Sequence, residues 1–465
     1  MNNQVITRFA PSPTGNLHIG GARTALYNWL FAHKNHGRMV LRIEDTDKER
    51  STDTALENIL DGMRWLGLNW DGDIYYQSQF IKKHQEIAYQ LLESGNAYYC
   101  YCSADELSKM KEDALSQGKS PVYNNKWRER LPNEIDKKIQ PVLRLKTPLK
   151  GKTIINDKVQ GLIEYDNKDI DDFIILRSDG TPTYMLASVV DDHELGITDI
   201  IRGDDHLNNA ARQINICLLM SWIPPSYSHI PLIHSSNGTK LSKRDGALSV
   251  SDYKKDGYLA EAVLNYLLRL GWSYGDQEFF SINEMIEFFN IEKIHKSPAR
   301  LDLKKLLNVN SHYLKEKNDD ELIKLIFKSE RILFDKKLEE KMKLIIPHLK
   351  TKSKTLNELS ELIRYLYQER PIEIKEFDFN IYTPEINDLV TSFKLSLEKI
   401  DNWDLMIIRD LFDNFLVKTN TKLIDIAKPL RIILTGSIVP TGIYELLLPL
   451  GKAEIINRIS DYLNN

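Results

Sequence analysis

A short strand that turns through a Pro- and Gly-rich segment into a helix most constrains how this chain can fold. Val5 to Phe9 has the composition of a strand, and residues 11–21 (Pro-Ser-Pro-Thr-Gly-Asn-Leu-His-Ile-Gly-Gly) form the turn. A helix with regularly spaced apolar residues follows until Gly37, then a strand at Met39–Ile43 and a helix at about Asp53–Leu66. This order predicts an α/β core with a parallel, doubly wound sheet of the Rossmann type.

The chain changes character near residue 310. Before that point, residues 151–165 indicate irregular β structure in an inserted module, and residues 183–190 and 197–201 indicate two further strands. Beyond it, helical patterns dominate. One predicted helical face carries Leu356, Leu359, Ile363 and Leu366. The sequence therefore predicts an α/β part followed by an all-α part.

The composition excludes several classes of protein. Hydrophobic residues make up 42% and charged residues 28%, which is ordinary for a soluble globular protein. No apolar run approaches the roughly 20 residues that a membrane helix needs. We therefore expect no membrane partner. Three cysteines cannot form a disulfide framework, so we expect a cytoplasmic protein. Because the net charge is only −4, a nucleic-acid partner would have to bind local basic patches.

The first turn has the chemistry of a phosphate site. A helix N-terminus presents backbone N–H groups and partial positive charge to an anion. Gly20 and Gly21 would let a nucleotide approach the backbone closely. His18, just before the helix, would donate a hydrogen bond to charge that develops on a phosphate. Taken alone, such a segment is more often a loop with an ordinary surface histidine.

A basic loop far along the chain changes that balance. Lys240-Leu241-Ser242-Lys243-Arg244 lies between two turn segments, and its long cationic side chains suit the β- and γ-phosphates of ATP as pyrophosphate leaves. A short basic run by itself is usually only a solvated loop. The two segments together, in this order, favour one ATP site assembled from both.

The two segments resemble the HIGH and KMSKS signatures of the class I aminoacyl-tRNA synthetases. With Arg8-Phe9-Ala10 before it, the first resembles the form found in bacterial-type glutamyl-tRNA synthetases. The resemblance covers essentially the whole chain. It extends through residues 42–47 (Arg-Ile-Glu-Asp-Thr-Asp), 182–184 (Pro-Thr-Tyr), 189–193 (Val-Val-Asp-Asp-His), 201–206 (Ile-Arg-Gly-Asp-Asp-His), 296–300 (Lys-Ser-Pro-Ala-Arg), 429–431 (Pro-Leu-Arg) and 434–436 (Leu-Thr-Gly).

This resemblance implies five modules. They are the first half of a Rossmann catalytic core at 1–96, an inserted connective module that binds the tRNA acceptor end at 97–180, the second half of the core with the basic loop at 181–246, a region that contacts the tRNA stem at 247–310, and a helical anticodon-binding region at 311–465. The last of these is the all-α part.

The resemblance also implies a reaction. The α-carboxylate of L-glutamate would attack the α-phosphorus of ATP, giving glutamyl-adenylate and pyrophosphate. The terminal ribose of tRNA(Glu) would then take the glutamyl group. Neither step needs a protein nucleophile, because positioning and electrostatic stabilisation suffice. Family members generally activate glutamate only when tRNA is bound, carry Mg²⁺ on the ATP phosphates and act as monomers, and we expect the same here.

The resemblance assigns residues to glutamate. The glutamate-binding residues would be Arg8, Ser12, Glu44, Tyr184, Ser188 and Arg202. Arg8, Tyr184 and Arg202 would face the side-chain carboxylate, since a planar guanidinium can pair both oxygens. Ser12 and Glu44 would hold the α-amino group. Arg8 and Arg202 could instead form ordinary ion pairs with acids such as Glu44 or Asp204, and Ser188 stands where the family often has asparagine.

Other residues would serve ATP and tRNA. The ATP-binding residues would be Gly15, His18, Gly20, Gly21, Lys240, Leu241, Ser242 and Lys243. The catalytic residues would be His18, Gly20, Lys240, Lys243 and Arg244. Asp47, Arg50 and Lys352 would contact tRNA.

Two groups of residues resemble metal sites. Cys100-Tyr101-Cys102 is similar to the first half of a zinc site in some family members, but Trp127-Arg128-Glu129 stands where a Cys-X-His should follow Pro121-Val122-Tyr123. Because structural zinc needs four nitrogen or sulfur ligands, we predict no zinc and no other metal held by the protein. The Asp-Asp-His clusters at 191–193 and 204–206 are more simply explained as groups that support substrate contacts.

Lys352 departs from the family pattern. Many relatives have an arginine at the aligned position, where it helps exclude tRNA(Gln) at the anticodon. Lysine lacks the planar fork of arginine, so the sequence leaves open a ligase that also charges tRNA(Gln) and supplies an amidotransferase. A solvated surface lysine is an equally good interpretation of this position.

Other functions fit the sequence less well. A glutaminyl enzyme would share both motifs but normally ends in a β-barrel. A shortened enzyme that glutamylates a modified tRNA base would lack the helical half, and small nucleotidyltransferases leave the residues after 250 unexplained. From a different class, a catalytically inert tRNA-binding paralogue stays an alternative. The intact residues that argue against it are His18, Gly20, Lys243, Arg8 and Arg202.

Overall fold

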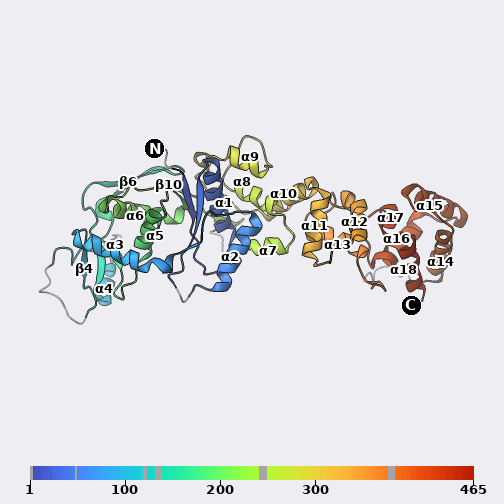
Figure 1. Cartoon of the computed structure of the whole chain (residues 1–465), viewed down its shortest axis with the longest axis horizontal. Coiled ribbons are helices and arrows are strands. Elements are labelled where there is room, and N and C mark those ends of the chain that lie inside the picture. The colour runs from blue at the N-terminus through green and yellow to red at the C-terminus, as the bar shows by residue number, and fades with distance from the viewer. Residues whose placement is uncertain are drawn as a thin grey trace. The chain divides into compact units, whose positions relative to one another are not determined.

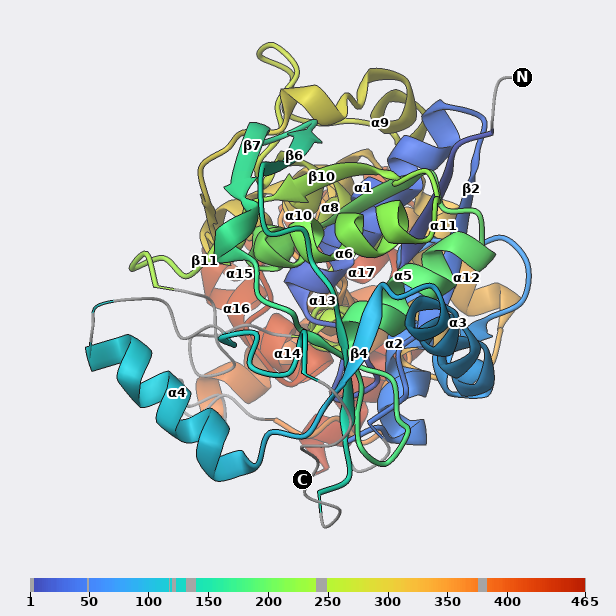
Figure 2. The same ribbon diagram turned by 90° about the vertical axis from the view of Figure 1, so that its left-hand side faces the viewer.

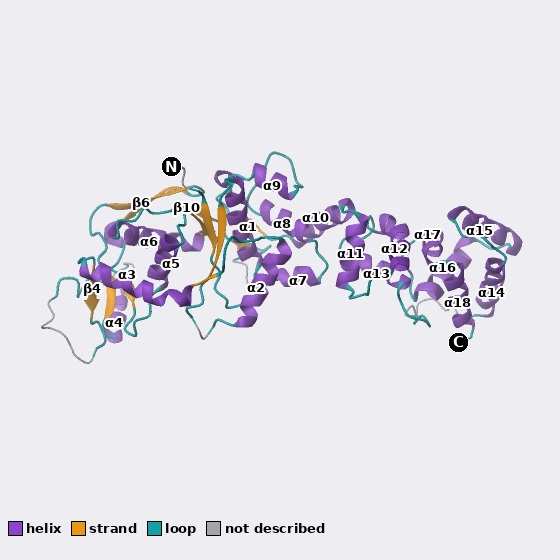
Figure 3. Ribbon diagram, in the orientation of Figure 1, coloured by secondary structure: helices purple, strands orange, loops and turns teal. Residues whose placement is uncertain are grey.

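The chain forms two compact units. The structure, a computed structural model, describes residues 4–47, 50–116, 118, 123–130, 139–239, 249–374 and 383–464. The first unit comprises residues 1–254 and 263–303, and the second comprises residues 255–262 and 304–465. Figure 1 follows the chain from the N-terminus to the C-terminus. In the described residues, all strands belong to the first unit and the second is helical, as Figure 3 shows. The finer division into five modules stays a prediction.

A parallel sheet forms the centre of the first unit. Strand β1 (Ile6–Phe9) pairs in parallel with β2 (Arg38–Ile43), which pairs in parallel with β3 (Tyr75–Tyr76). Helix α1 (Ile19–Lys34) connects β1 to β2, and α2 (Asp53–Leu66) follows β2. These elements confirm the strand–helix–strand–helix order predicted from the sequence, and with it the Rossmann-type core.

The sheet continues through strands from later in the chain. Strand β9 (Asp199–Gly203) lies beside β1, to which a backbone hydrogen bond of 2.9 Å joins it at Thr198. Strand β10 (Ser226–Ile230) pairs in parallel with β9 along its length and in parallel with β6 (Lys152–Asp157) on its other edge. Figure 2 shows β10, β6 and β7 (Gly161–Asp166) side by side. The segment predicted as irregular is therefore a regular antiparallel hairpin at the edge of the sheet that contains β9 and β10.

The prediction of a strand at residues 183–190 is wrong, because these residues begin helix α5 (Tyr184–Glu194). Residues 186–192 are all buried, so the segment shows no amphipathic period, and a buried helix then looks like a buried strand. The difference matters for the site. In a helix, residues four apart lie on the same face, so α5 brings Tyr184, Ser188 and Asp192 to one side.

The inserted module packs on the helices of the core. Its antiparallel sheet consists of β4 (Ala97–Cys100), β5 (Val142–Leu145) and β8 (Ile174–Leu176). Apolar residues of this sheet share one buried cluster with α3 (Ile81–Glu93), α5 and α6 (Leu207–Leu219). The module is therefore continuous with the catalytic core, although its helix α4 (Ala104–Ser116) has no buried residue among those described.

The remaining strands and α-helices up to residue 316 follow, and the last of them belongs mainly to the second unit. They are β11 (Ile233–His234), α7 (Val250–Lys255), α8 (Ala260–Arg269), α9 (Ile282–Phe288), β12 (Ala299–Arg300) and α10 (Leu303–Glu316). Within the first unit, buried Arg23 of α1 ties the segments before β11 and after α8 to the core, since its guanidinium donates to the carbonyl oxygens of Leu270, at 2.7 Å, and of Pro231.

The second unit confirms the all-α prediction. After α10, its helices are α11 (Asp319–Ser329), α12 (Lys336–Leu349), α13 (Leu356–Ile363), α14 (Pro384–Glu398), α15 (Leu405–Thr419), α16 (Leu423–Thr435), α17 (Ile443–Leu450) and α18 (Lys452–Leu463). The predicted apolar face is buried at all four positions, Leu356, Leu359, Ile363 and Leu366. Among the helices of the described residues, none has the length and apolar character to cross a membrane.

Candidate functional site

A cavity of about 510 Å³ opens where helix α1 begins, at the carboxyl ends of β1, β2 and β9. Ligands of open α/β sheets bind at this edge. The predicted residues on its wall are Arg8, Ser12, Gly15, His18, Gly20, Gly21, Glu44, Tyr184 and Arg202. The structure thus brings residues predicted for ATP and residues predicted for glutamate to one cavity.

His18 is the N-cap of helix α1. Its backbone is extended (φ −83°, ψ 163°), and its Nδ1 accepts a hydrogen bond from the Gly21 N–H at 3.0 Å. Because Nδ1 is the acceptor, the neutral imidazole carries its proton on Nε2. The side chain is exposed and lines the cavity. One wall of the cavity therefore offers the imidazole N–H together with the N-terminal backbone N–H groups of a helix.

Gly20 makes this position of the histidine ring possible. A Cβ at Gly20 would lie 3.1 Å from both Cε1 and Nδ1 of His18, and a Cβ at Gly21 would lie 3.2 Å from Cδ1 of Leu17. These distances are shorter than the usual optimum for non-bonded carbon atoms. Without side chains at both glycines, the ring can fold back over the first turn of α1, so the glycines position the histidine as well as opening the backbone.

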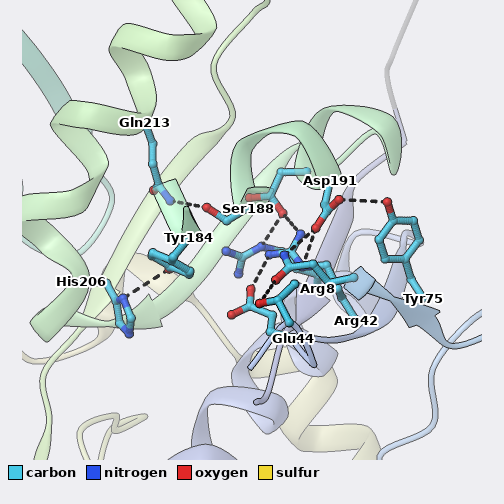
Figure 4. Close-up of polar contacts among 12 residues, drawn as sticks. Arg8, Arg42, Glu44, Tyr75, Tyr184, Ser188, Asp191, His206 and Gln213 are labelled. Atoms are coloured by element: carbon cyan, nitrogen blue, oxygen red, sulfur yellow. Dashed lines mark hydrogen bonds and ion pairs between the residues drawn. The ribbon is translucent and has the colours of Figure 1, made fainter. Parts of the chain in front are cut away.

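Buried ion pairs lie behind the cavity wall. Oδ1 of Asp192 contacts Nε of Arg8 at 3.1 Å and Nη1 of Arg42 at 2.5 Å, and Nη2 of Arg42 contacts Oε1 of Glu44 at 3.0 Å. Figure 4 shows Arg8, Arg42 and Glu44 meeting at the centre of this network. Arg8 therefore pairs with Asp192, and not with the Glu44 or Asp204 considered from the sequence, while its guanidinium still lines the cavity.

The ion pairs and burial together shift the pKa values of these buried groups. Burial by itself would lower the pKa of Arg42, but the carboxylates of Asp192, Glu44 and Asp191 raise it. Burial would raise the pKa of Asp192, and the guanidinium groups of Arg42 and Arg8 outweigh burial and lower it. Glu44 differs, since burial raises its pKa despite the contact with Arg42. Asp192 is thus held as an anion that orients Arg8.

Asp191 supports the same network from the neighbouring position of α5. Its carboxylate accepts hydrogen bonds from the Tyr75 hydroxyl at 2.9 Å, Nε2 of Gln77 at 2.6 Å and Nε2 of His84 at 2.6 Å. The side chains of Asp191 and His84 are fully buried. The two adjacent acids are therefore engaged within the protein, one holding arginines and the other tying α5 to α3 and to the chain after β3.

Arg202 is a further buried arginine of the wall. Its Nε–H donates to Nε2 of His229 at 3.1 Å, its Nη2–H donates to the His206 carbonyl oxygen at 3.3 Å, and its guanidinium carbon lies 5.6 Å from the centre of the Tyr227 ring. The Tyr184 hydroxyl lies 3.4 Å from Nδ1 of His206. Burial lowers the pKa of Arg202 and raises that of Tyr184. Since no ion pair to Arg202 is found among the described residues, its charge suits an anion in the cavity.

Ser188 does not line the cavity in the described part of the chain. Its hydroxyl oxygen accepts a hydrogen bond from Nε2 of Gln213 at 2.7 Å, and the side chain is buried, as Figure 4 shows. In this position Ser188 joins helix α5 to helix α6. Its predicted contact with glutamate stays a prediction.

The basic loop, with Lys240, Leu241, Ser242, Lys243 and Arg244, lies outside the described residues. The chain reaches the cavity on both sides of it. Leu232 and Ile233 line the wall before the loop. After the loop, Ser249 forms a β-bridge with His18, and the N–H of Val250 donates to the Leu17 carbonyl at 2.9 Å. The roles of the loop residues stay predictions.

The residues predicted to contact tRNA lie on the surface. Arg50 Nε and Asp47 Oδ2 form an ion pair of 2.7 Å, with side chains 75% and 43% exposed. Surface pairs of this kind contribute little to stability. Exposed Lys352 donates from Nζ to the Pro440 carbonyl oxygen at 2.9 Å within the second unit. The tRNA contacts of all three residues stay predictions.

The predicted half-site for zinc belongs to an aromatic cluster. Buried Cys100 packs with Tyr123 and Trp127, its Sγ 3.5 Å from the Tyr123 hydroxyl oxygen, and the Arg144 guanidinium lies 3.8 Å above the Tyr123 ring. Burial, with Cys100 alongside, raises the pKa of the Cys102 thiol to about 11. Where the chain is described, no group of three or more His, Cys, Asp or Glu side chains could hold a metal ion.

Comparisons with known proteins agree with this geometry. A family model described as tRNA synthetases class I (E and Q), catalytic domain, matches residues 4–308, and a model described as an anticodon binding domain matches residues 308–463. The two matches meet at the change from α/β to all-α structure, so both parts of the chain have relatives of known type.

Individual relatives match over the full length. Glutamate–tRNA ligase 1 of Beijerinckia indica subsp. indica is 47% identical, and glutamate–tRNA ligase of Nitrobacter winogradskyi is 48% identical, each match covering 99% of both chains. Among solved structures, a glutamate tRNA ligase from Elizabethkingia meningosepticum in complex with its amino acid is 28% identical, with a TM-score of 0.83 and full coverage of both chains. The chain therefore belongs to the glutamate–tRNA ligases, a family of class I aminoacyl-tRNA synthetases with a helical anticodon-binding domain.

Proposed function

We propose that this chain attaches L-glutamate to tRNA(Glu) in two ATP-dependent steps through glutamyl-adenylate, as a monomer in the cytoplasm. One observation carries the proposal. A single cavity joins the N-terminus of α1, capped by His18, to the buried arginines Arg8 and Arg202. A helix N-terminus suits a phosphate, and paired arginines suit a carboxylate, so ATP and an acidic amino acid can meet there.

The arginines explain a preference for glutamate over glutamine. Arg8 and Arg202 would bind the side-chain carboxylate together with the Tyr184 hydroxyl, while Ser12 and Glu44 would hold the α-amino group. An amide offers one acceptor and one donor group, whereas a guanidinium only donates. Glutamine would therefore leave a buried arginine poorly paired, a penalty that supports strong discrimination.

The first step would use the N-terminus of α1. As the glutamate α-carboxylate attacks, a bond forms to the α-phosphorus and the bond to pyrophosphate breaks. Nε2–H of His18 and the backbone N–H groups near Gly20 would stabilise the charge that develops on the α-phosphate. Lys240, Lys243 and Arg244 would accompany the departing pyrophosphate. In the second step, a ribose hydroxyl of tRNA attacks the activated carbonyl and AMP leaves.

Mg²⁺ would enter this site with ATP. The ion is bound mainly by substrate phosphates and water in many ATP-dependent enzymes, and on this wall Asp205 carries a carboxylate of fitting chemistry. When bound, Mg²⁺ supplies charge neutralisation to the phosphates. The residues of the chain would orient the nucleotide and the amino acid.

The choice of tRNA is the finer part of the proposal. Asp47 and Arg50 would contact tRNA beside the catalytic core, and Lys352 would take part in recognising the anticodon. A second candidate is a ligase that also charges tRNA(Gln) and supplies an amidotransferase. Lys352 favours it, because a lysine lacks the bidentate fork and here donates to a backbone carbonyl.

Charging of labelled glutamate onto transcripts of tRNA(Glu) and tRNA(Gln) tests both candidates. We expect tRNA(Glu) to be charged and pyrophosphate exchange to require bound tRNA. Charging of tRNA(Gln) as well would establish the second candidate, and Lys352→Arg should then reduce charging of tRNA(Gln) more than that of tRNA(Glu). Binding of tRNA without charging of either transcript would refute the reaction and favour an inert paralogue.

We also predict that the protein needs no zinc. Metal analysis of the purified chain should find less than stoichiometric zinc, and dialysis against a chelator, followed by return of Mg²⁺, should leave charging and the melting temperature unchanged. The reason is that this place offers only two cysteine ligands, packed among aromatic rings, and structural zinc needs four nitrogen or sulfur ligands. One tightly held zinc ion per chain would contradict this prediction.

A further inference from the structure

A buried histidine and a buried carboxylate stand behind Arg202. Nδ1 of His229 on β10 lies 2.6 Å from Oδ2 of Asp157 at the end of β6, and Nε2 of His229 accepts from Nε–H of Arg202 on β9 at 3.1 Å. The side chains of His229 and Asp157 are fully buried, and Arg202 is 6% exposed. Three adjacent strands thus place the three side chains in one row that ends at the cavity.

The chemistry of the partners leaves one arrangement of protons on His229. An ionised carboxylate only accepts hydrogen bonds, so Nδ1 of His229 must donate to Asp157. A guanidinium only donates, so Nε2 must carry a lone pair toward Arg202. His229 is therefore neutral, with its proton on Nδ1. Burial, outweighing Asp157, lowers the pKa of His229, and the charges of Arg202 and Arg8 act in the same direction.

We propose that Asp157 and His229 are positioning residues for glutamate specificity, because they hold the Nε edge of Arg202 and so fix which N–H groups of its guanidinium face the cavity. The inference rests on the proposed role of Arg202 in binding the side-chain carboxylate. Neither Asp157 nor His229 touches the cavity wall as described, so both act through Arg202.

A fixed guanidinium would sharpen the choice between glutamate and glutamine. An arginine that can turn adapts to an amide by presenting a single N–H to its oxygen. An arginine held at Nε by His229 and at Nη2 by the His206 carbonyl cannot turn in this way. It presents donors in fixed directions, which suits two acceptor oxygens and leaves an amide NH₂ group facing another donor.

Substitutions can separate the two ends of the row. His229→Asn keeps an amide near the position of Nδ1, where it can donate to Asp157, but leaves Nε–H of Arg202 without its acceptor. His229→Gln places a carbonyl oxygen near the position of Nε2, where it can accept from Arg202. Asp157→Asn keeps one oxygen for the N–H groups of Val159 and Gln160, now at 2.9 and 2.8 Å from Oδ1, and turns its NH₂ toward His229. That NH₂ would move the histidine proton to Nε2, against Arg202.

We expect KM for glutamate to rise about 10-fold in His229→Asn and in Asp157→Asn, with kcat within about 2-fold, since the loss of the hydrogen bond between His229 and Arg202 leaves the guanidinium less well oriented to bind glutamate. The preference for glutamate over glutamine should fall by a similar factor. His229→Gln should recover most of the lost affinity. In ¹⁵N-histidine spectra, the His229 proton should sit on Nδ1 in the parent and on Nε2 in Asp157→Asn.

Lys158→Met is the matched control. Nζ of Lys158, the residue after β6, pairs with Oδ1 of Asp199, the first residue of β9, at 2.5 Å. This ion pair does not include Arg202. We expect this variant to keep the parent KM for glutamate within about 2-fold, because neither Lys158 nor Asp199 lines the cavity as described.

Arg202→Gln distinguishes the proposed function from this inference. If it leaves KM for glutamate unchanged, the role of Arg202 fails and the inference fails with it. If it raises KM while His229→Asn and Asp157→Asn do not, only the inference is overturned. Equal losses of kcat and melting temperature in His229→Asn, His229→Gln and Lys158→Met, without a change in KM, would show a purely structural role and would also overturn it.

Discussion

Replacing Arg42 with glutamine is expected to destabilise the first unit by about 3–5 kcal/mol, the usual effect of removing one partner from a buried ion pair. Arg42 is 1% exposed and contacts three acids, Asp192 at 2.5 Å, Glu44 at 3.0 Å and Asp191 at 4.0 Å. Glutamine cannot replace its positive charge. Hydrogen-exchange mass spectrometry should show faster exchange in β2 and α5, which carry these residues.

The loss should depend on pH. The folded-state pKa of Asp192 is lowered by Arg42 and Arg8 against the effect of burial. The stability contributed by a carboxylate of this kind is present above its unfolded pKa of about 3.9 and is lost as pH falls through the lowered folded value. In Arg42→Gln much of this contribution is already missing. The difference between variant and parent should therefore be largest near neutral pH and shrink in acid.

Lys83→Gln provides the control on the same helix pair. Lys83 and Glu194 connect α3 to α5 at 3.3 Å, but their side chains are 39% and 40% exposed. Breaking such a surface pair should change stability by less than about 1 kcal/mol. If Arg42→Gln exchanges hydrogen no faster than Lys83→Gln in β2 and α5, the buried network does not stabilise the unit as we infer.

The fold could be predicted from the sequence where the pattern has a clear period. The bounds of α2 and the buried face of α13 follow from apolar residues on one side of a helix. Helix α5 could not be predicted because it is buried on all sides and contains Val189 and Val190, which favour strands. The hairpin of β6 and β7 was assigned to the inserted module because its pairing with β10 joins segments that are distant in the sequence.

The site, too, has a part that could be predicted from the sequence and a part that could not. Local motifs identified the cavity wall, since His18, Gly20 and Gly21 lie within one turn of chain. The residues behind the wall were missed, although Arg42 and Asp192 stand within segments that resemble the family. A pair such as Asp157 and His229 is 72 residues apart. Its only signal in the sequence is a histidine in a short strand, Ser226–Ile230, and such a histidine finds its partner only when the sheet forms.

His18→Ala is expected to slow adenylate formation by about 10²–10³-fold, the usual loss when one preorganised donor to a developing charge is removed. Nδ1 of His18 accepts from Gly21, so the neutral ring carries its proton on Nε2, and the side chain lines the cavity where the α-phosphate would lie. Glutamate-dependent pyrophosphate exchange in the presence of tRNA measures this step. The affinity for tRNA should not change, because His18 is not among the residues predicted to contact tRNA.

Alanine removes two functions of His18, and His18→Asn separates them. Asparagine is among the best N-cap residues, so it can accept from the Gly21 N–H and preserve the start of α1, but its amide is too short to reach the position of Nε2. We expect His18→Ala to lose about 1 kcal/mol of stability from the missing cap, and His18→Asn to lose almost none. Both should lose the same factor in exchange rate. If His18→Asn keeps the parent rate, the histidine serves only as a cap, and the charge on the phosphate is stabilised by the backbone N–H groups alone.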